Sequence, residues 1–120
     1  MRTTSLAHGA KRVAINTLAC HRMPDFGVNK EIDLINDDDR VRHVNEVATS
    51  WARSHGVAVI DTYGALCKGG YHGEVNGVPL YEDGLHYTPQ SAPIYWRWLA
   101  PQIRDIASGR TPAGSATLSL

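Results

Sequence analysis

The chain has 120 residues, enough for one modest domain, and its twelve lysines and arginines balance twelve aspartates and glutamates. With a formal net charge of zero and no basic stripe or polybasic cluster, nothing points to nucleic acid as a partner or to a basic membrane anchor. No apolar run approaches the ~18–20 residues of a transmembrane helix, and residues 1–10 lack the apolar core of a signal peptide.

The first part of the chain is expected to form a strand followed by a long loop. Residues 11–18 contain a short apolar run with β-branched members, which predicts a buried strand. Residues 21–36 are polar, contain a proline and a glycine, and show no period. We therefore expect a long loop there, and such loops are usually functional or mobile.

An amphipathic helix is predicted over residues 40–55, because apolar side chains recur there every three or four positions. Residues 36–39 supply N-cap candidates and negative charge at its start, and Gly56 is placed to end it. The apolar run Val57–Ile60 then predicts a second buried strand. Strand, helix and strand in this order indicate a βαβ unit with a right-handed crossover and a parallel sheet.

The second part of the chain is predicted to contain a hairpin and a final helix. Val75-Asn76-Gly77-Val78 is typical of a two-residue hairpin turn. Thr88 and Pro89 are suited to begin the last helix as N-cap and first residue, and Pro101 predicts a kink or break in it. Ser108–Leu120 is small and polar, which predicts a disordered tail. The apolar face of the last helix is expected to consist of Ala92, Tyr95, Leu99, Ile103 and Ile106.

One short segment carries residues suited to acid–base chemistry. Asp83 and His86 stand three positions apart in a loop that leads directly into the last helix, with Gly84 between them to give the turn its backbone freedom. A neutral imidazole can take a proton from a serine hydroxyl if a carboxylate orients its ring and stabilises its positive charge. An Asp-x-x-His spacing also occurs by chance on protein surfaces. The surrounding sequence therefore decides whether the motif indicates catalysis.

That context is a resemblance to a known family over most of the chain. The segments that carry it, in order, are Val13–Cys20, residues 40–55, Val57–Asp61, Leu66-Cys67, Val75–Leu80, Asp83–Thr88 and Trp96–Pro101. Together they resemble the second half of an SGNH hydrolase domain. They are most similar to the extracytoplasmic SGNH domains attached to bacterial membrane acyltransferases that O-acetylate or O-acylate glycans. Leu18 and Ala19 depart from the threonine and proline that the family usually has before the first cysteine.

The resemblance implies an α/β fold, specifically a three-layer α/β/α sandwich around a parallel sheet, of which residues 1–107 form the C-terminal part. It implies a serine esterase or O-acyltransferase acting on acyl esters of carbohydrates, with Asp83 as the orienting carboxylate and His86 as the general base. No cofactor is implied. The location implied for the parent protein is extracytoplasmic, and the parent is expected to be attached to a membrane acyltransferase domain.

The nucleophile of that family is missing from the sequence. It lies in a Gly-Asp-Ser motif after the first strand, and neither Gly-Asp-Ser nor Gly-x-Ser-x-Gly occurs here. Residues 27–30 imitate one oxyanion-hole element, but a lysine replaces its acid and the loop follows the wrong strand, so we interpret the match as coincidence. The chain by itself is expected to be inactive, either as a fragment of a longer protein or as the complement of a separately encoded first half.

The cysteines leave two alternatives open, a disulfide in an oxidising compartment or two free thiols. Cys20 and Cys67 match positions that pair in the similar acyltransferase-linked domains, so the resemblance implies a disulfide. The histidines and cysteines show neither HExxH nor CxxC spacing, and a metal site is not expected.

A function of a different class stays open beside the enzyme. Tyr95, Trp96 and Trp98 occupy more than one face of the last helix, and core packing accounts for most of them. An exposed member of this group would suit a non-catalytic half-domain that binds glycan or a partner chain.

Overall fold

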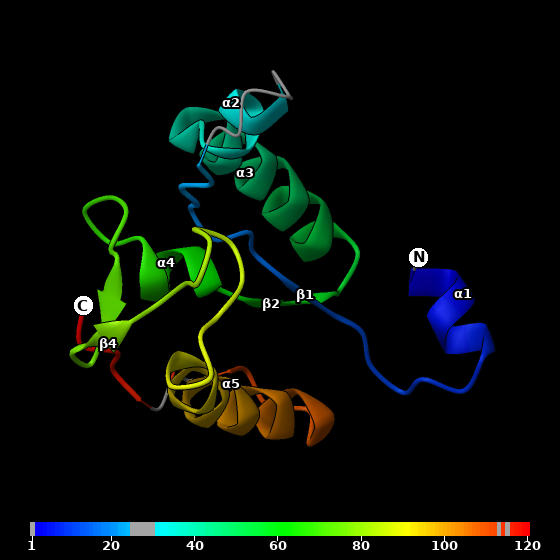
Figure 1. Cartoon of the computed structure of the whole chain (residues 1–120). Helices are drawn as coiled ribbons and strands as arrows, with labels where there is room; N and C mark the ends of the chain where they lie inside the picture. The colour runs from blue at the N-terminus through cyan, green and yellow to red at the C-terminus, as the bar shows by residue number, and fades with distance from the viewer. Residues whose placement is uncertain (1, 25–30, 113, 115) are drawn as a thin grey trace.

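The computed structural model describes residues 2–24, 31–112, 114 and 116–120, and Figure 1 shows how its elements are arranged. The helices are α1 (Arg2–Ala7), α2 (Glu31–Ile35), α3 (Asp38–Ser54), α4 (Thr62–Leu66) and α5 (Ser91–Ala107). The strands are β1 (Ala14–Asn16), β2 (Ala58–Ile60), β3 (Glu74–Val75) and β4 (Val78–Pro79).

A strand–helix–strand unit lies at the centre of the molecule. β1 and β2 run parallel, with Ala14 opposite Ala58 and Asn16 opposite Ile60. α3 connects them and packs on β2, while α5 contacts β2 from the other side of the sheet (Figure 1). The predicted parallel βαβ unit is confirmed, and the described residues form a mixed α/β structure around a small two-stranded sheet.

The ends of α3 follow the chemistry of its sequence. The Asp37 carboxylate accepts hydrogen bonds from the backbone N–H groups of Asp39 and Arg40 at 3.0 and 3.1 Å, which satisfies two of the unpaired donors at a helix start. At the other end Gly56 takes a φ of +62°, the left-handed conformation that ends helices. β2 begins two residues later, at Ala58, within the predicted run Val57–Ile60.

The prediction of a loop throughout residues 21–36 is wrong at its C-terminal end. α2 forms a short helix at Glu31–Ile35 and packs on α3. A helix of this length shows too few apolar positions for a period to be visible in the sequence. Asn36, which follows it, makes two reciprocal 2.8 Å hydrogen bonds with the backbone of Met23 and so ties the start of the loop to its end.

α5 begins at Ser91, two residues after the predicted first residue Pro89, and it does not break at Pro101. The Thr88 hydroxyl accepts from the N–H of Ser91 at 3.0 Å, and the Ser91 hydroxyl accepts from the N–H of Thr88 at 3.1 Å. The helix then continues through Pro101 to Ala107. Pro101 leaves the carbonyl of Arg97 without a helical partner, and Arg97 lies on the exposed side, where water can satisfy that carbonyl.

The buried face of α5 agrees with the predicted one only in part. Ala92 is exposed and Ile103 is 42% exposed, whereas Trp98 and Gln102 are buried. Trp98 offers more apolar area than its neighbour Leu99, and the Gln102 amide donates to the Trp98 carbonyl at 3.3 Å, so its burial leaves no polar group unpaired. The other three predicted positions, Tyr95, Leu99 and Ile106, do pack in the core, so the prediction is wrong only for Ala92 and Ile103.

The core consists of two clusters that share side chains. One contains both cysteines with Leu66, Val75, Leu80 and Tyr81, and the other contains Ile60, Trp98 and Ile106. Tyr95 and Leu118 pack against both. Leu66 and Leu80 are each 1% exposed, so truncating either to alanine should cost about 2–5 kcal/mol.

The predicted hairpin is confirmed, and it also holds the end of the chain. β3 and β4 pair antiparallel around Asn76 and Gly77, whose φ angles of 49° and 78° fit a two-residue turn with both residues left-handed. Asn76 exchanges hydrogen bonds with the backbone of Ser119 at 2.6 and 2.9 Å. The C-terminal segment was expected to be a disordered tail, but Ser119 lies against this turn and Leu118, partly buried, packs against the core.

No helix in the described part of the chain is both long enough and apolar enough to cross a membrane.

Candidate active site

The Asp83–His86 turn brings its two titratable side chains into direct contact. The Asp83 Oδ2 atom lies 2.7 Å from His86 Nδ1. The other carboxylate oxygen, Oδ1, accepts from the backbone N–H groups of Leu85 and His86 at 3.0 and 2.8 Å. Gly84 takes a φ of +78°, which lets the chain turn between them. One carboxylate thus fixes both the backbone of the turn and the imidazole ring.

These hydrogen bonds determine the ionisation of Asp83. The backbone N–H of His86 and then its imidazole hold the pKa of the Asp83 carboxyl well below its ordinary value. An ionised carboxylate can only accept, so the proton of the neutral ring resides on Nδ1 and the lone pair on Nε2. This is the tautomer that a general base needs.

Antiparallel contacts on both sides hold the turn. Tyr81 and Tyr87 form a bridge, and the N–H of Glu82 donates to the carbonyl of His86 at 2.8 Å. The rings of Tyr81 and Tyr87 stack at 5.4 Å between centroids, and Tyr87 stacks in turn on Tyr95 of α5 at 4.8 Å. Burial is the main reason why the pKa of both Tyr81 and Tyr87 lies above its ordinary value, so both phenols stay neutral. The residues on both sides of the turn thus pack in a stack of neutral aromatic rings.

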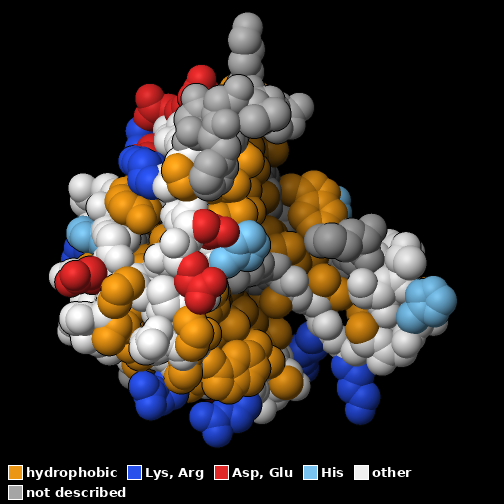
Figure 2. Space-filling model, in the orientation of Figure 1, with side chains coloured by type: hydrophobic (Ala, Val, Ile, Leu, Met, Phe, Trp, Pro, Cys, Tyr) orange, Lys and Arg blue, Asp and Glu red, His pale blue; other side chains and the backbone are white. Residues whose placement is uncertain are grey.

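The Asp83–His86 pair is open to solvent. The His86 side chain is 71% exposed and that of Asp83 is 42% exposed. Figure 2 shows acidic and histidine side chains together near the centre of one face, with apolar side chains around them. In this arrangement Nε2 is accessible to a reacting group, but nothing around it yet excludes water.

A second histidine, which the sequence analysis did not single out for this role, belongs to the same neighbourhood. His21 is half-buried, and its ring centroid lies 5.6 Å from that of Tyr81. Burial and then the nearby His86 lower the pKa of His21, so it is neutral near pH 7. Its only sequence signal was its place beside Cys20.

Cys20 and Cys67 are joined in a disulfide, with their Cα atoms 6.0 Å apart. Both residues are 2% exposed, and they tie the segment after β1 to the end of α4. His21 follows the first half-cystine directly, so the crosslink also fixes the chain beside this second histidine. The two half-cystines belong to the core and not to an open site.

No serine in the described residues donates a hydrogen bond to His86. Ser91 is fully buried and donates to the Leu80 carbonyl at 2.6 Å. Ser5 lies in α1 and Ser50 in α3, both on other elements.

Ser54 and His55 are adjacent but cannot act as a nucleophile and base. The Ser54 hydroxyl lies 3.0 Å from His55 Nδ1, the distance of a hydrogen bond. The same Nδ1 lies 2.8 Å from the Trp51 carbonyl, which can only accept, so Nδ1 carries a proton and cannot receive one from Ser54.

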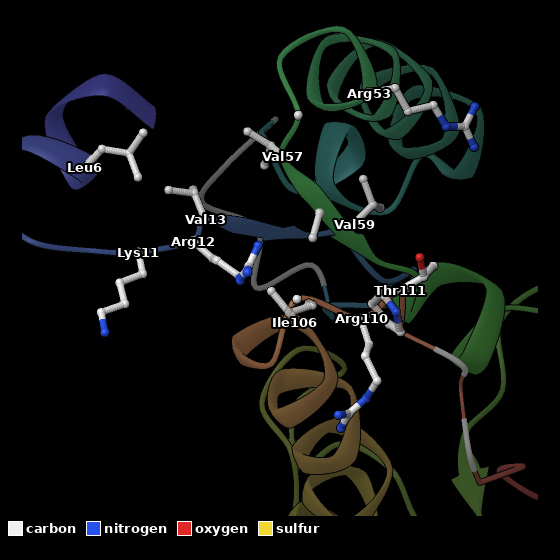
Figure 3. A pocket seen from close by; sticks show the side chains of 14 residues that line it. Leu6, Lys11, Arg12, Val13, Arg53, Val57, Val59, Ile106, Arg110 and Thr111 are labelled. Carbon is white, nitrogen blue, oxygen red and sulfur yellow. The ribbon is translucent and has the colours of Figure 1, made fainter.

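One cavity lies away from the Asp83–His86 pair, at the amino ends of the two parallel strands. It has a volume of about 570 Å³, and Val13 and Val57, which line it, precede the two parallel strands. Figure 3 shows Arg12 extending into it, whereas Lys11 and Arg53 point in different directions. Open α/β sheets bind ligands at the carboxyl ends of their strands, so this cavity at the opposite end is not the site we assign.

Two further expectations concern metals and the oxyanion hole. Within the described residues, no group of three or more histidine, cysteine or acidic side chains is placed to hold a metal ion. Residues 27–30, which imitate an oxyanion-hole element in the sequence, lie outside the described residues.

Comparison of the chain with family models, with curated proteins and with solved structures gave no match. The assignment of a function therefore depends on the sequence pattern and on the geometry of the Asp83–His86 turn.

Proposed function

We propose that this chain supplies the acid–base half of a serine esterase or O-acyltransferase site of the SGNH type. The observation that carries this proposal is the 2.7 Å contact between Asp83 Oδ2 and His86 Nδ1, which leaves the lone pair of Nε2 exposed. Orientation by a carboxylate at one ring nitrogen and access at the other are the two requirements of a histidine base.

In the proposed reaction, His86 Nε2 takes the proton of a serine hydroxyl as that oxygen attacks the carbonyl of an acyl ester. The imidazolium, held by Asp83, then returns the proton to the leaving alcohol. A second cycle transfers the acyl group from the serine to water or to a carbohydrate hydroxyl. The serine and the oxyanion donors come from a polypeptide segment outside this sequence, because the sequence has no Gly-Asp-Ser motif.

The surface of the βαβ unit has room for such a segment. β1 pairs with β2 along one edge, and its other edge has no partner strand among the described residues. Beside it, part of the apolar face of α3 is uncovered, with Val44 42% and Val47 57% exposed. These side chains and Ile15 of β1 line an apolar groove of about 550 Å³. We propose that the segment with the serine adds a strand and a covering layer here, completing the three-layer sandwich.

The test is an ester-hydrolysis assay with the missing half supplied separately. Purified chain alone should hydrolyse a simple acetyl ester no faster than its His86→Ala variant. Mixed with a first-half fragment that contains Gly-Asp-Ser, it should gain turnover that His86→Ala and Asp83→Asn remove. A stable complex of the two halves without turnover would argue against the proposal.

A non-catalytic glycan- or partner-binding half-domain is the second candidate. Trp96 supports it, because this side chain on α5 is 57% exposed, and exposed aromatic rings pack well on sugar faces. In that case Trp96→Ala should abolish glycan binding while His86→Ala leaves it intact. Attachment of the parent to a membrane acyltransferase and an extracytoplasmic location remain parts of the first proposal, and the disulfide fits an oxidising compartment.

A further inference from the structure

We infer that Arg22 is a positioning residue, and that the segment His21–Met23, clamped to the start of α3, holds the Asp83–His86 turn in its relay geometry. This segment is called the brace below. We call the Asp83–His86 turn the relay turn, a name that rests on the proposed function, whereas the brace is argued from the structure alone.

The brace is fixed at its outer side by a bidentate ion pair. Arg22 Nη1 and Nη2 donate to the two carboxylate oxygens of Asp38 at 2.8 and 2.6 Å, the planar fork that an arginine–carboxylate pair prefers. Arg22 Nη1 also donates to the carbonyl of His21 at 2.6 Å and lies 3.3 Å from that of Asn36. The guanidinium carbon lies 5.0 Å from the centroid of the Tyr71 ring. The Arg22 side chain thus connects the brace to the residue after α2 and to the start of α3.

Two further attachments keep the brace from moving along its own length. On one side Cys20 is bonded to Cys67. On the other, the reciprocal 2.8 Å hydrogen bonds between Met23 and Asn36 fix the chain as it leaves the brace. The backbone of Arg22 therefore has a defined position in a segment without helix or strand structure.

The inner side of the brace presses directly on the relay turn. The backbone N–H of Arg22 donates to the Gly84 carbonyl at 3.1 Å. A Cβ atom added to Gly84 would overlap the carbonyl oxygen of Arg22, so the two backbones touch and only glycine fits. Because Gly84 lies between Asp83 and His86, its position decides whether the carboxylate faces the imidazole.

The brace also contains His21, a neutral side chain in the neighbourhood of the Asp83–His86 pair. The His21 ring centroid lies 5.6 Å from that of Tyr81, and burial, followed by the charge of His86, lowers the pKa of His21. Since burial keeps His21 uncharged near pH 7, it places no positive charge beside His86 when that ring accepts a proton. Loosening the brace would therefore change both the orientation of the turn and its surroundings.

The experiment reads the tautomer of His86 directly by ¹⁵N NMR of the imidazole ring in the full chain, together with the titration of the Asp83 carboxyl by ¹³C NMR. The variants are Arg22→Ala and Asp38→Asn, each of which breaks the outer ion pair. Matched controls are Arg110→Ala and Asp105→Asn, which break another arginine–aspartate pair, of 3.0 Å, at the far end of α5; its aspartate is as exposed as Asp38 and its arginine is more exposed than Arg22.

In the unaltered chain we expect the Nδ1–H tautomer to dominate near pH 7. Both brace variants should shift His86 to an exchanging mixture with the Nε2–H tautomer and should raise the pH at which Asp83 titrates, while both controls leave the two signals unchanged. If Arg22→Ala fails to fold, Asp38→Asn decides, since it keeps the Arg22 side chain and its contact with Tyr71.

Brace variants that keep the original tautomer and the original Asp83 titration would overturn the inference, and so would controls that change both signals as much. The readout needs no serine and no turnover. A complemented protein without esterase activity but with a brace-dependent tautomer would therefore refute the proposed function and uphold the brace.

Discussion

Gly84 packs so closely on Arg22 that no side chain fits between the two backbones, and the contact is closed by the 3.1 Å hydrogen bond from the Arg22 N–H to the Gly84 carbonyl. This contact joins two segments that are far apart in the sequence. Gly77 has the same left-handed φ of +78°, but no atom lies within 4 Å of the place where its Cβ would be. Comparing the two glycines therefore distinguishes the cost of the left-handed conformation from the cost of the close approach.

The first prediction compares alanine at these two glycines. Gly77→Ala should lower the free energy of unfolding by about 1–2 kcal/mol, the cost of a left-handed conformation for a residue with a Cβ. Gly84→Ala should cost more, because it adds the overlap with Arg22. Urea unfolding followed by circular dichroism measures both. Equal losses would show that the contact with Arg22 yields without strain.

The second prediction concerns pH. The folded pKa of Asp83 is lower than the unfolded value near 3.8, so its contribution to stability is present above about pH 4 and is lost as the pH falls towards the folded pKa. Asp83→Asn removes this contribution. The unaltered chain should therefore lose more stability than Asp83→Asn between pH 5 and pH 3 in urea titrations at about those pH values. The pKa of Asp38 is lowered too, by its hydrogen bond with Arg22. Because Asp38 is present in both proteins, its contribution to the pH dependence cancels in the comparison.

The third prediction concerns the disulfide. It links residues separated by 47 positions, and in the chain-entropy model such a crosslink stabilises the folded state by about 4 kcal/mol. The Cys20→Ala, Cys67→Ala double variant should show a loss of this order in unfolding experiments, and mass spectrometry of material made in an oxidising compartment should show the loss of two hydrogens. Two alkylatable thiols in that material would remove this argument for an extracytoplasmic parent.

The sequence predicted what depends on local chemistry. The caps of α3, the parallel βαβ unit and the Asn76-Gly77 turn each follow from residues close together in the chain. The burial of Trp98 on α5 could not be predicted in this way, because it depends on which elements face that helix. The ordered position of Ser119 could not be predicted either, because its hydrogen-bond partner Asn76 is remote in the sequence.

For the candidate site, the sequence identified Asp83 and His86 but not the residues that hold them. Their contact depends on a four-residue turn, which spacing and a glycine can reveal. The brace depends on Arg22 meeting both Asp38 and Gly84 from a segment without a regular period. No local pattern could show that a backbone at residue 22 touches one at residue 84.

The last prediction is that the purified chain associates with itself and that one substitution on α3 reduces this association. β1 has an open edge in the described structure, and the neighbouring groove exposes Val44, Val47 and Trp51, the combination that invites contacts between chains. Val47→Lys places a charge in this groove at the position that is most exposed, so it should cost little in folding stability. We expect analytical ultracentrifugation to show less association for Val47→Lys than for the unaltered chain.

Val41→Lys is the matched comparison, because Val41 lies on the same helix but is 7% exposed. A charge there should destabilise the fold and increase aggregation. The first-half fragment with Gly-Asp-Ser should suppress association of the unaltered chain and should bind the Val47→Lys variant less tightly, because both contacts use one surface. An unaltered chain that is monomeric, unfolds cooperatively and hydrolyses esters in a way that His86→Ala abolishes would contradict the half-site proposal. The nucleophile would then have to be sought among Ser5, Ser50, Ser54 and Ser91.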